Sequence, residues 1–502
     1  MRTKKSFPWH AIWYLLIFLF FFIWFSKLYP LVVYDTDDWF FLGHVRSAAP
    51  IWGVWNPAKV FPEFFMPLFS SLGCFLLMPF VGDYIDTMTI THALVVSGFL
   101  TVYFWSFSCL IKRLFSLPFS TTQLITSIFL LFHFWARQNG DDNNTYLFYC
   151  NDLNCYYNYL IPTVANASIV MYLIGNPKAA SLLSLEKPLR TGVCLVILYL
   201  AIFSNLVSSG VLAVYAGSCI LLQIWQNRKH FSLASFCKEN VLYLGILAGW
   251  LVSAIFELSG GRASVSDSLF SSEALLQTAK GYGSVLAECN RFFWISSIFF
   301  LLLGAGAFFF SGRRNGGNSF GFSIILIWLI TAVVIHIYEI FLCASVSPYN
   351  ISRSEYVFPT FFFLMLLTML SLGYLFSRYP QACAVFPLFL LLLISEVNLP
   401  GKAYRESNIS NFDGTVAAEI SRNIVSQIVA ADENGMKEMT LYVPVHVADP
   451  ANADNWPHNL QDAALISSTL YEHGIISYPI SLTVVASEEV NRLHHIPLPQ
   501  AD

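Results

Sequence analysis

The sequence predicts an all-α polytopic membrane protein that carries a small α/β domain at its C-terminus. Of its 502 residues, 56% are hydrophobic and only 12% are charged, whereas roughly a quarter of the residues in a soluble domain are charged. Apolar stretches recur through residues 1–398, and beyond them charges follow every few residues, as in a soluble chain. We therefore expect a transmembrane domain over 1–398 and an extracytoplasmic domain over 399–502.

The apolar stretches approach the roughly 20 residues that a helix needs to cross the hydrocarbon core of a bilayer. The first is too long and too aromatic for a cleaved signal peptide, so we expect it to remain as a membrane anchor. About eleven transmembrane helices are predicted, near residues 10–28, 88–111, 119–137, 157–175, 191–207, 210–226, 240–257, 292–310, 320–342, 356–377 and 382–398.

Residues 64–82 are also apolar, but we predict that they form an interfacial or re-entrant helix within a first outer loop, 29–87. Counting them as a span would place Lys112 and Arg113 on the same side as the acidic residues of that loop. Lys and Arg bias their loops toward the cytoplasm, and with an interfacial helix every predicted inner loop is basic. The N-terminus is then inside, the first loop and the C-terminal domain are outside, and the expected location is a bacterial cytoplasmic membrane.

The C-terminal domain shows alternating helical and strand patterns. An amphipathic pattern predicts helices over 414–431 and 460–473, and short apolar runs predict strands over 439–447 and 480–485. Another stretch, 138–158, is rich in Asn and Asp, and we expect it to be a hydrated outer loop in which Cys150 and Cys155 could form a disulfide.

Three carboxylates, Asp35, Asp37 and Asp38, lie within four residues directly after the first apolar segment. Neighbouring carboxylates repel one another unless a cation, a hydrogen-bond donor or a shared proton compensates, so such clusters are frequent where ligands bind or protons move. The alternative is a solvated start of a loop. Three acids this close together favour a functional site.

The order of elements over the first 115 or so residues resembles the GT-C superfamily of membrane glycosyltransferases. An acidic pair follows the first span, a Pro-containing interfacial helix opens with residues 61–68, and the second span ends in Lys112 and Arg113. A second similarity lies at residues 353–359, which resemble the Arg-Tyr-x-x-x-Pro start of a late span in such enzymes. Here Glu355 occupies the place directly before Tyr356, and Arg353 lies two residues earlier.

This resemblance implies transfer of a sugar from a polyprenyl-phosphate donor to a glycan or lipid acceptor outside the membrane. It assigns the catalytic base to Asp37, while Asp38 would orient the acceptor or bind a divalent cation such as Mg or Mn, and Asp35 is the third candidate. Such a reaction needs a base for the acceptor hydroxyl and positive charge for the departing phosphate. The candidates for donor and phosphate binding are Lys59, Arg46, Arg353, Tyr356 and Glu63. Among the cations Lys59 is favoured, because it immediately precedes the interfacial helix.

Two ionisable residues, His336 and Glu339, are three residues apart on the ninth predicted span and should share one helix face. An acid within a membrane is costly unless it is paired or faces a cavity. They could support function, or they could form a buried hydrogen bond with each other.

The sequence also disfavours several function classes. It has no basic tract to bind a nucleic acid, and it has no Walker A loop, dinucleotide-binding fingerprint or Gly-x-Ser-x-Gly motif. Two alternatives remain beside a glycosyltransferase. A polysaccharide polymerase or ligase would have its main charges in the later outer loops, 258–291 or 343–355, and a lipid-linked glycan transporter or flippase would more often have paired halves.

Overall fold

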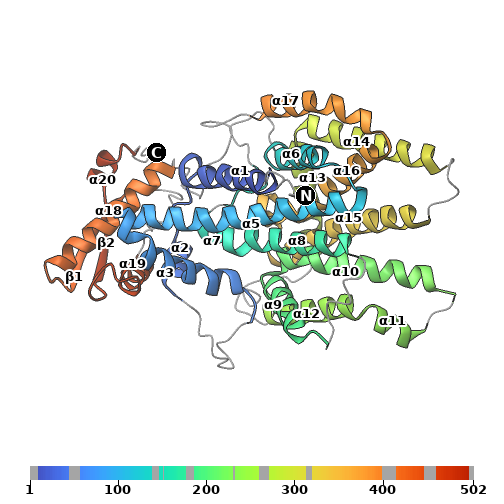
Figure 1. The fold of residues 1–502 in the computed structure, drawn as a ribbon. Coiled ribbons are helices and arrows are strands. Elements are labelled where there is room, and N and C mark those ends of the chain that lie inside the picture. The colour runs from blue at the N-terminus through green and yellow to red at the C-terminus, as the bar shows by residue number, and fades with distance from the viewer. Residues whose placement is uncertain are drawn as a thin grey trace, which may run out of the picture.

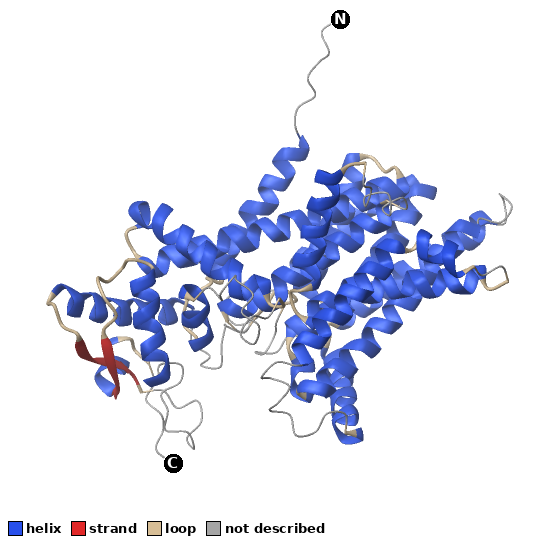
Figure 2. Cartoon of the chain, turned by 90° about the horizontal axis from the view of Figure 1, so that it is seen from below, coloured by secondary structure: helices blue, strands red, loops and turns tan. Residues whose placement is uncertain are grey.

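The computed structural model is mostly helical, with a small parallel sheet near the C-terminus. It describes residues 9–44, 57–137, 146–150, 152–176, 186–229, 232–258, 271–312, 319–397, 414–445 and 460–496. Long helices lie side by side through most of the molecule, and the sheet with its helices lies at one end of them (Figure 1; Figure 2). Helix α2 (Thr36–Gly43) lies at this same end.

Within the described residues, seven helices are long and apolar enough to cross a membrane, which indicates a multi-pass membrane protein. An eighth span exists if α11 (Leu233–Glu239) and α12 (Val241–Leu258), which meet at a bend of 81°, are counted together. Three of the seven are single helices: α5 (Tyr84–Phe115), α10 (Leu206–Asn227) and α16 (Ser354–Arg378). Two are parts of longer helices: Arg291–Phe310 within α14 (Arg291–Gly312) and Ile327–Val346 within α15 (Ser319–Val346). The other two are continuous runs of elements: Trp9–Leu28, made of α1 (Trp9–Ile23) and η1 (Trp24–Leu28), and Leu153–Gly175, made of α7 (Leu153–Cys155), η3 (Tyr156–Leu160) and α8 (Ile161–Gly175).

All eleven segments predicted to span coincide with helices in the described part of the chain, but three of these helices are short. They are α6 (Phe119–Trp135, 17 residues), α9 (Pro188–Ile202, 15 residues) and α17 (Phe386–Glu396, 11 residues). Helix length therefore supports seven or eight spans. The predicted outer segment 258–291 also contains a helix, α13 (Ser272–Glu288), whose start is capped by Ser271.

The predicted interfacial helix is broken into three pieces, none of which is long enough to span. They are η2 (Phe61–Phe65), α3 (Met66–Leu76) and α4 (Met78–Val81). A proline lies at the start of each piece, where its fixed φ and missing N–H are tolerated. Helix α3 packs closely on α5, because a Cβ at Gly73 would lie only 2.2 Å from Oγ1 of Thr91. The segment therefore braces α5.

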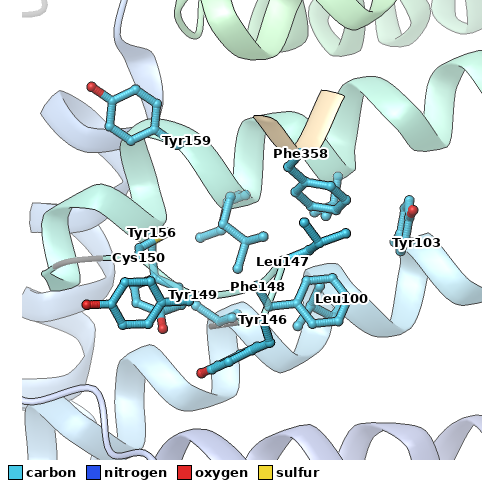
Figure 3. Packing of buried hydrophobic residues seen from close by; sticks show 14 of the residues in the cluster. Leu100, Tyr103, Tyr146, Leu147, Phe148, Tyr149, Cys150, Tyr156, Tyr159 and Phe358 are labelled. Carbon is cyan, nitrogen blue, oxygen red and sulfur yellow. The ribbon is translucent and has the colours of Figure 1, made fainter. Parts of the chain in front are cut away.

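An aromatic core lies between α5, α6 and α16, and the segment 146–150 fills part of it (Figure 3). Phe148 is fully buried, with its ring stacked on His133 at 4.7 Å and 5.8 Å from the ring of Phe358. Tyr146 accepts a hydrogen bond from Nε1 of Trp24 at 3.0 Å. The expectation of a hydrated loop is wrong for this part, because its aromatic side chains outweigh the polar residues on either side of it.

The C-terminal unit has the predicted order of helix, strand, helix and strand. It consists of α18 (Gly414–Glu433), β1 (Glu438–Pro444), α19 (Leu460–Glu472), β2 (Ser481–Ser487) and the short α20 (Glu488–Leu493). The strands pair in parallel, from Glu438 opposite Ser481 to Pro444 opposite Ser487. A parallel pair needs a crossover connection, and α19 lies within it. Leu441 and Val443 of β1 are fully buried.

Candidate functional site

Two of the three clustered acids form the start of α2. Asp35 is its N-cap, and its side chain accepts a hydrogen bond from the backbone N–H of Asp37 at 3.0 Å. The Asp38 carboxylate reaches back to accept from the backbone N–H groups of Asp35 at 3.1 Å and Tyr34 at 3.2 Å. This reciprocal arrangement is a capping box, which satisfies N–H groups that the first turn of a helix leaves without partners.

Asp38 also joins α2 to a distant segment of the chain. Its second oxygen accepts a hydrogen bond from the backbone N–H of Asn154 in α7 at 2.7 Å, and the residue is only 1% exposed. Burial raises the pKa of the Asp38 carboxyl well above its ordinary value, and the nearby Asp152 and Asp35 raise it further. Three backbone donors therefore bind Asp38, which gives it a structural role at the junction of α2 and α7.

Asp37 differs from its neighbours because its side chain is exposed. It lies in the first turn of α2, where a carboxylate is favoured by the partial positive charge of the helix N-terminus. The negative charge of Asp37 raises the pKa of Asp152. Of the three predicted acids, Asp37 is the one whose carboxylate is open to a substrate.

Asp152 is a fourth acid that sequence reasoning did not select. It is the N-cap of α7 and accepts hydrogen bonds from the backbone N–H of Cys155 at 2.6 Å and from its Sγ at 3.2 Å. Burial raises the pKa of Asp152 to about 6, although the bonds from Cys155 and the charge of Arg353 oppose the shift. The sequence offers one signal for this residue, because Asp is favoured at the N-cap of a helix and Asp152 directly precedes the helix that contains Cys155.

Replacing Asp152 by Asn should reduce the pH dependence of stability. A carboxyl whose pKa rises on folding stabilises the fold fully below its unfolded pKa, and this contribution is lost as the pH rises through the folded value of about 6. Asn cannot ionise. The melting temperature of the wild type in detergent should therefore fall more between about pH 4 and pH 7 than that of D152N. The exposed acid Glu273 supplies the control, and an E273Q profile that flattened as much as D152N would contradict the assignment.

Arg353 is held by the acid that interrupts the family-like motif. Its Nε donates to Oε1 of Glu355 at 2.6 Å, and its Nη2 donates to Sγ of Cys155 at 3.2 Å. The guanidinium lies over the rings of Tyr159 at 5.5 Å and Tyr356 at 5.4 Å, which is within cation–π range. Burial acts to lower the pKa of Arg353, but Glu355, Cys155, Tyr159 and Tyr356 together outweigh it, and the pKa lies above its ordinary value.

The structure thus brings both predicted motifs to one short segment, 152–155. Asp38 of the acid cluster binds the backbone of Asn154, and Arg353 of the late motif binds Cys155. Tyr356 lies beside them, with its hydroxyl 3.1 Å from that of Tyr159. The segments of this site lie more than 100 residues apart in the sequence, so only the fold could show that they meet. Cys150 and Cys155 are both buried and free, so the disulfide alternative is not realised.

The other predicted phosphate ligands lie apart from this junction or outside the described residues. Lys59 has a left-handed backbone with φ of 62°, and its N–H donates to the carbonyl of Ser204 at 2.8 Å. Its Nζ lies 4.0 Å from Oε2 of Glu257. Glu63 is 7% exposed at the start of η2. Arg46 lies outside the residues that the structure describes.

An apolar cavity of about 530 Å³ begins two residues beyond Lys59. It lies among η2, α5, α8, α9 and α12, and its walls are almost entirely hydrocarbon. Arg190, at the start of α9, is its one charged lining residue in the described part of the chain. Its lining includes Phe61, Phe65, Phe99, Ala165, Tyr172 and Leu198. Such a cavity suits an apolar chain and excludes a polar ligand from most of its length.

His336 and Glu339 do not bind each other. Nδ1 of His336 lies 2.5 Å from the carbonyl of Ala332, and the His336 ring packs edge-on against Tyr282 at 5.6 Å. Glu339 is fully buried, and neither of its oxygens has a hydrogen-bond partner among the described residues. The predicted alternative of a buried His–Glu hydrogen bond is therefore wrong.

Across the described residues, no three His, Cys, Asp or Glu side chains converge in a way that could hold a metal ion. Comparisons with known proteins add nothing to this geometry. No family model, curated protein or solved structure matches the chain.

Proposed function

We propose that this protein is a membrane glycosyltransferase of GT-C type, which moves a sugar from a polyprenyl-phosphate donor to a glycan or lipid acceptor outside the membrane. The observation that carries the proposal is the meeting of an exposed acid and a held cation at residues 152–155. Asp37 directly precedes Asp38, which binds the backbone of Asn154, and Arg353 binds Cys155. The charges of Asp37 and Arg353 both act on the pKa of Asp152. Acid and cation are the two groups that the reaction needs.

The chemistry follows from their charges. Asp37, as the carboxylate, takes the proton of an acceptor hydroxyl while that oxygen forms a bond to the anomeric carbon of the sugar. The bond from this carbon to the donor phosphate breaks, and the phosphate oxygen leaves with the electron pair. Arg353 stabilises the negative charge that develops there, because its planar guanidinium can hold two phosphate oxygens. Glu355 keeps the guanidinium in place before the donor binds.

The apolar cavity supports a lipid-linked donor. Its volume is about 530 Å³, and it begins at Phe61, next to the Lys59 turn. A polyprenyl chain would lie along this cavity, with its phosphate extending from the Phe61 end toward Arg353. A hydrocarbon chain gains roughly 0.8 kcal/mol for each CH₂ that it buries, although in a membrane the chain already lies in hydrocarbon. The cavity therefore binds the chain mainly through close contact with its walls and less by removing it from water.

The proposed topology has eleven crossings, an inner N-terminus and an outer active site in a bacterial cytoplasmic membrane. Helix α5 supports this orientation. It begins beside the acidic residues Asp83 and Asp86 and ends in Lys112 and Arg113, about 48 Å away for a helix of this length. Arg378 likewise lies in the last turn of α16, which begins at the proposed site. Basic residues at these far ends are those that the positive-inside rule places in the cytoplasm.

Filling the cavity should weaken donor binding without affecting the acceptor. Ala165 lines the cavity from α8, and an A165W side chain would occupy much of the space meant for the lipid chain. We expect the KM for the donor to rise about tenfold or more, since each 1.4 kcal/mol of lost binding is a factor of ten. L195W is the matched control, because Leu195 is 52% exposed on α9 and does not line the cavity. Equal KM values in the two variants would exclude the cavity as the donor site.

The direct test is chemical. Surface glycans and lipid-linked glycans from cells with and without this chain are compared by mass spectrometry, and a mass difference of a single sugar supports the proposal. A change in chain length of a polymer, without a change in its repeat, would instead indicate the polymerase or ligase. Accumulation of an unmodified lipid-linked precursor on the inner leaflet would indicate the flippase.

A further inference from the structure

The C-terminal unit is docked directly on the helix that carries Asp37. Oγ1 of Thr469 in α19 donates to the backbone carbonyl of Trp39 in α2 at 2.7 Å, and Thr469 is fully buried. Oγ of Ser468 lies 3.2 Å from Nε2 of His44, at the end of the same helix. α2 and α19 are therefore joined by polar contacts between segments more than 400 residues apart.

The two helices are in such close contact that one position must be glycine. A Cβ at Gly43 would lie 2.6 Å from Oγ1 of Thr469 and 2.8 Å from its Cα. Real Cβ atoms do not approach backbone atoms this closely, so any larger residue would push α19 away from α2. The glycine is thus explained by the docking itself.

Contacts from α18 hold the unit on the neighbouring segments. Oγ of Ser421, which is fully buried, donates to the carbonyl of Val33 at 2.7 Å, just before the acid cluster. Arg422 bridges Asp83 at 3.3 Å and Asp86 at 2.7 Å, at the start of α5. This ion pair is partly exposed and contributes little by itself. The unit nonetheless contacts the chain on both sides of Asp37.

Helix α2 needs such support because it is short. It has eight residues, and isolated helices of fewer than about 12 residues are marginal in water. Its N-terminal end is fixed by Asp35 and Asp38, and its C-terminal half has the docked α19 as its partner. Helix α2 also packs against α3, so loss of the α19 contact would loosen the helix without releasing it.

We infer that the C-terminal unit is a brace that fixes α2, and that Thr469 is a positioning residue for Asp37. The inference rests on the proposed function for its effect on the reaction, but the docking is independent of it. The unit acts through α2 and not by contact with the reacting atoms. Its removal or loosening changes the rate of transfer, and the binding of the lipid donor in the cavity is unaffected.

The test uses the full-length protein and the variant Thr469→Val, which removes the hydroxyl and keeps the shape. Hydrogen–deuterium exchange should show the amides of Trp39 to Gly43 exchanging about tenfold faster, because opening of α2 is no longer opposed by this bond. The kcat for transfer should fall several-fold with an unchanged KM for the donor. Thr469→Ser keeps the hydroxyl and should restore both. Gly43→Ala, which separates the helices, should reproduce the loss.

Ser467→Ala is the matched control. Ser467 is a neighbour of Thr469 on α19, but its Oγ accepts from the N–H of Ile480 inside the unit at 2.7 Å. At equal melting temperature this variant should leave the exchange of α2 unchanged. Unchanged exchange in Thr469→Val overturns the inference, as does normal kcat in a variant whose α2 exchanges faster. If the wild type transfers no sugar at all, the proposed function fails, and exchange alone then decides whether the brace exists.

Discussion

Replacing Asp37 by Asn is expected to reduce sugar transfer by about 10²- to 10⁴-fold, the range of a positioned general base. The substitution keeps the size of the side chain and removes its ability to take a proton. Because the Asp37 side chain is exposed and only its backbone N–H takes part in the capping of α2, the melting temperature should stay close to that of the wild type. Transfer from a purified polyprenyl-phosphate sugar, measured with membrane levels equalised, checks the rate.

Glu273→Gln is the control for this loss. Glu273 is an exposed acid in the first turn of another helix, α13, so it shares the position of Asp37 in its helix without the site. The Glu273→Gln variant should transfer sugar at the wild-type rate. Unchanged transfer by D37N would remove Asp37 from the mechanism, and a loss in D37N with normal transfer in Arg353→Gln would confine the chemistry to the acid cluster. The reverse pattern would favour a polymerase or ligase with its main charges in the later loops.

Replacing Asp38 by Ala is expected to lower the free energy of unfolding by about 3 kcal/mol or more, since it leaves three buried backbone donors without partners and each costs roughly 1–3 kcal/mol. The donors belong to Tyr34, Asp35 and Asn154. The change also separates α2 from α7, so transfer should be lost together with stability. Thermal unfolding in detergent measures the effect, reported as the shift in melting temperature.

Asp38→Asn separates the structural role of this residue from a role in proton transfer. Its amide retains one oxygen that can accept a backbone hydrogen bond, and it cannot ionise. We expect a smaller loss of stability than in D38A, because at least one of the three donors keeps a partner. Transfer by D38N at a rate near that of the wild type would leave Asp38 purely structural. A full loss of transfer in a stable D38N would instead assign it a part in the chemistry.

Most of the helices could be predicted from hydropathy because each is a continuous apolar run. Whether a segment is apolar enough to lie in lipid depends on its own residues alone. The C-terminal elements were equally predictable, since the hydrophobic repeat of 3.6 residues in a helix and of 2 residues in a strand depends only on neighbouring residues. Helix lengths were less so. Helix α9 ends at Ile202 because Asn205 already caps the start of α10, and α17 begins only at Phe386 because residues 380–385 form a 3₁₀ helix. Helix α13 formed where an outer loop was expected.

The candidate site, too, could be predicted from the sequence only in part. The sequence selected Asp37, Asp38 and Arg353 from spacing and from resemblance, but it could not rank the acids, because the rank depends on which carboxylate is buried. Asp38 is 1% exposed and bound by three donors, while Asp37 is exposed. Asp152 escaped notice because its neighbourhood looked like a hydrated loop. Tyr146, Phe148 and Tyr149 were expected in that loop, but they are buried, and the ring of Phe148 contacts that of Phe358.

The sequence by itself determined that this is a multi-pass membrane protein with a small C-terminal unit of helices and strands, since composition and periodicity depend only on residues that are close in the sequence. Only the tertiary structure decided which residues of these parts contact one another. It set the Asp38 carboxylate on the backbone of Asn154, the Arg353 guanidinium on Cys155, and Thr469 on the carbonyl of Trp39. These contacts join residues 116, 198 and 430 positions apart. Each is a short-range interaction that only packing of distant segments can create, and no local pattern encodes such a distance.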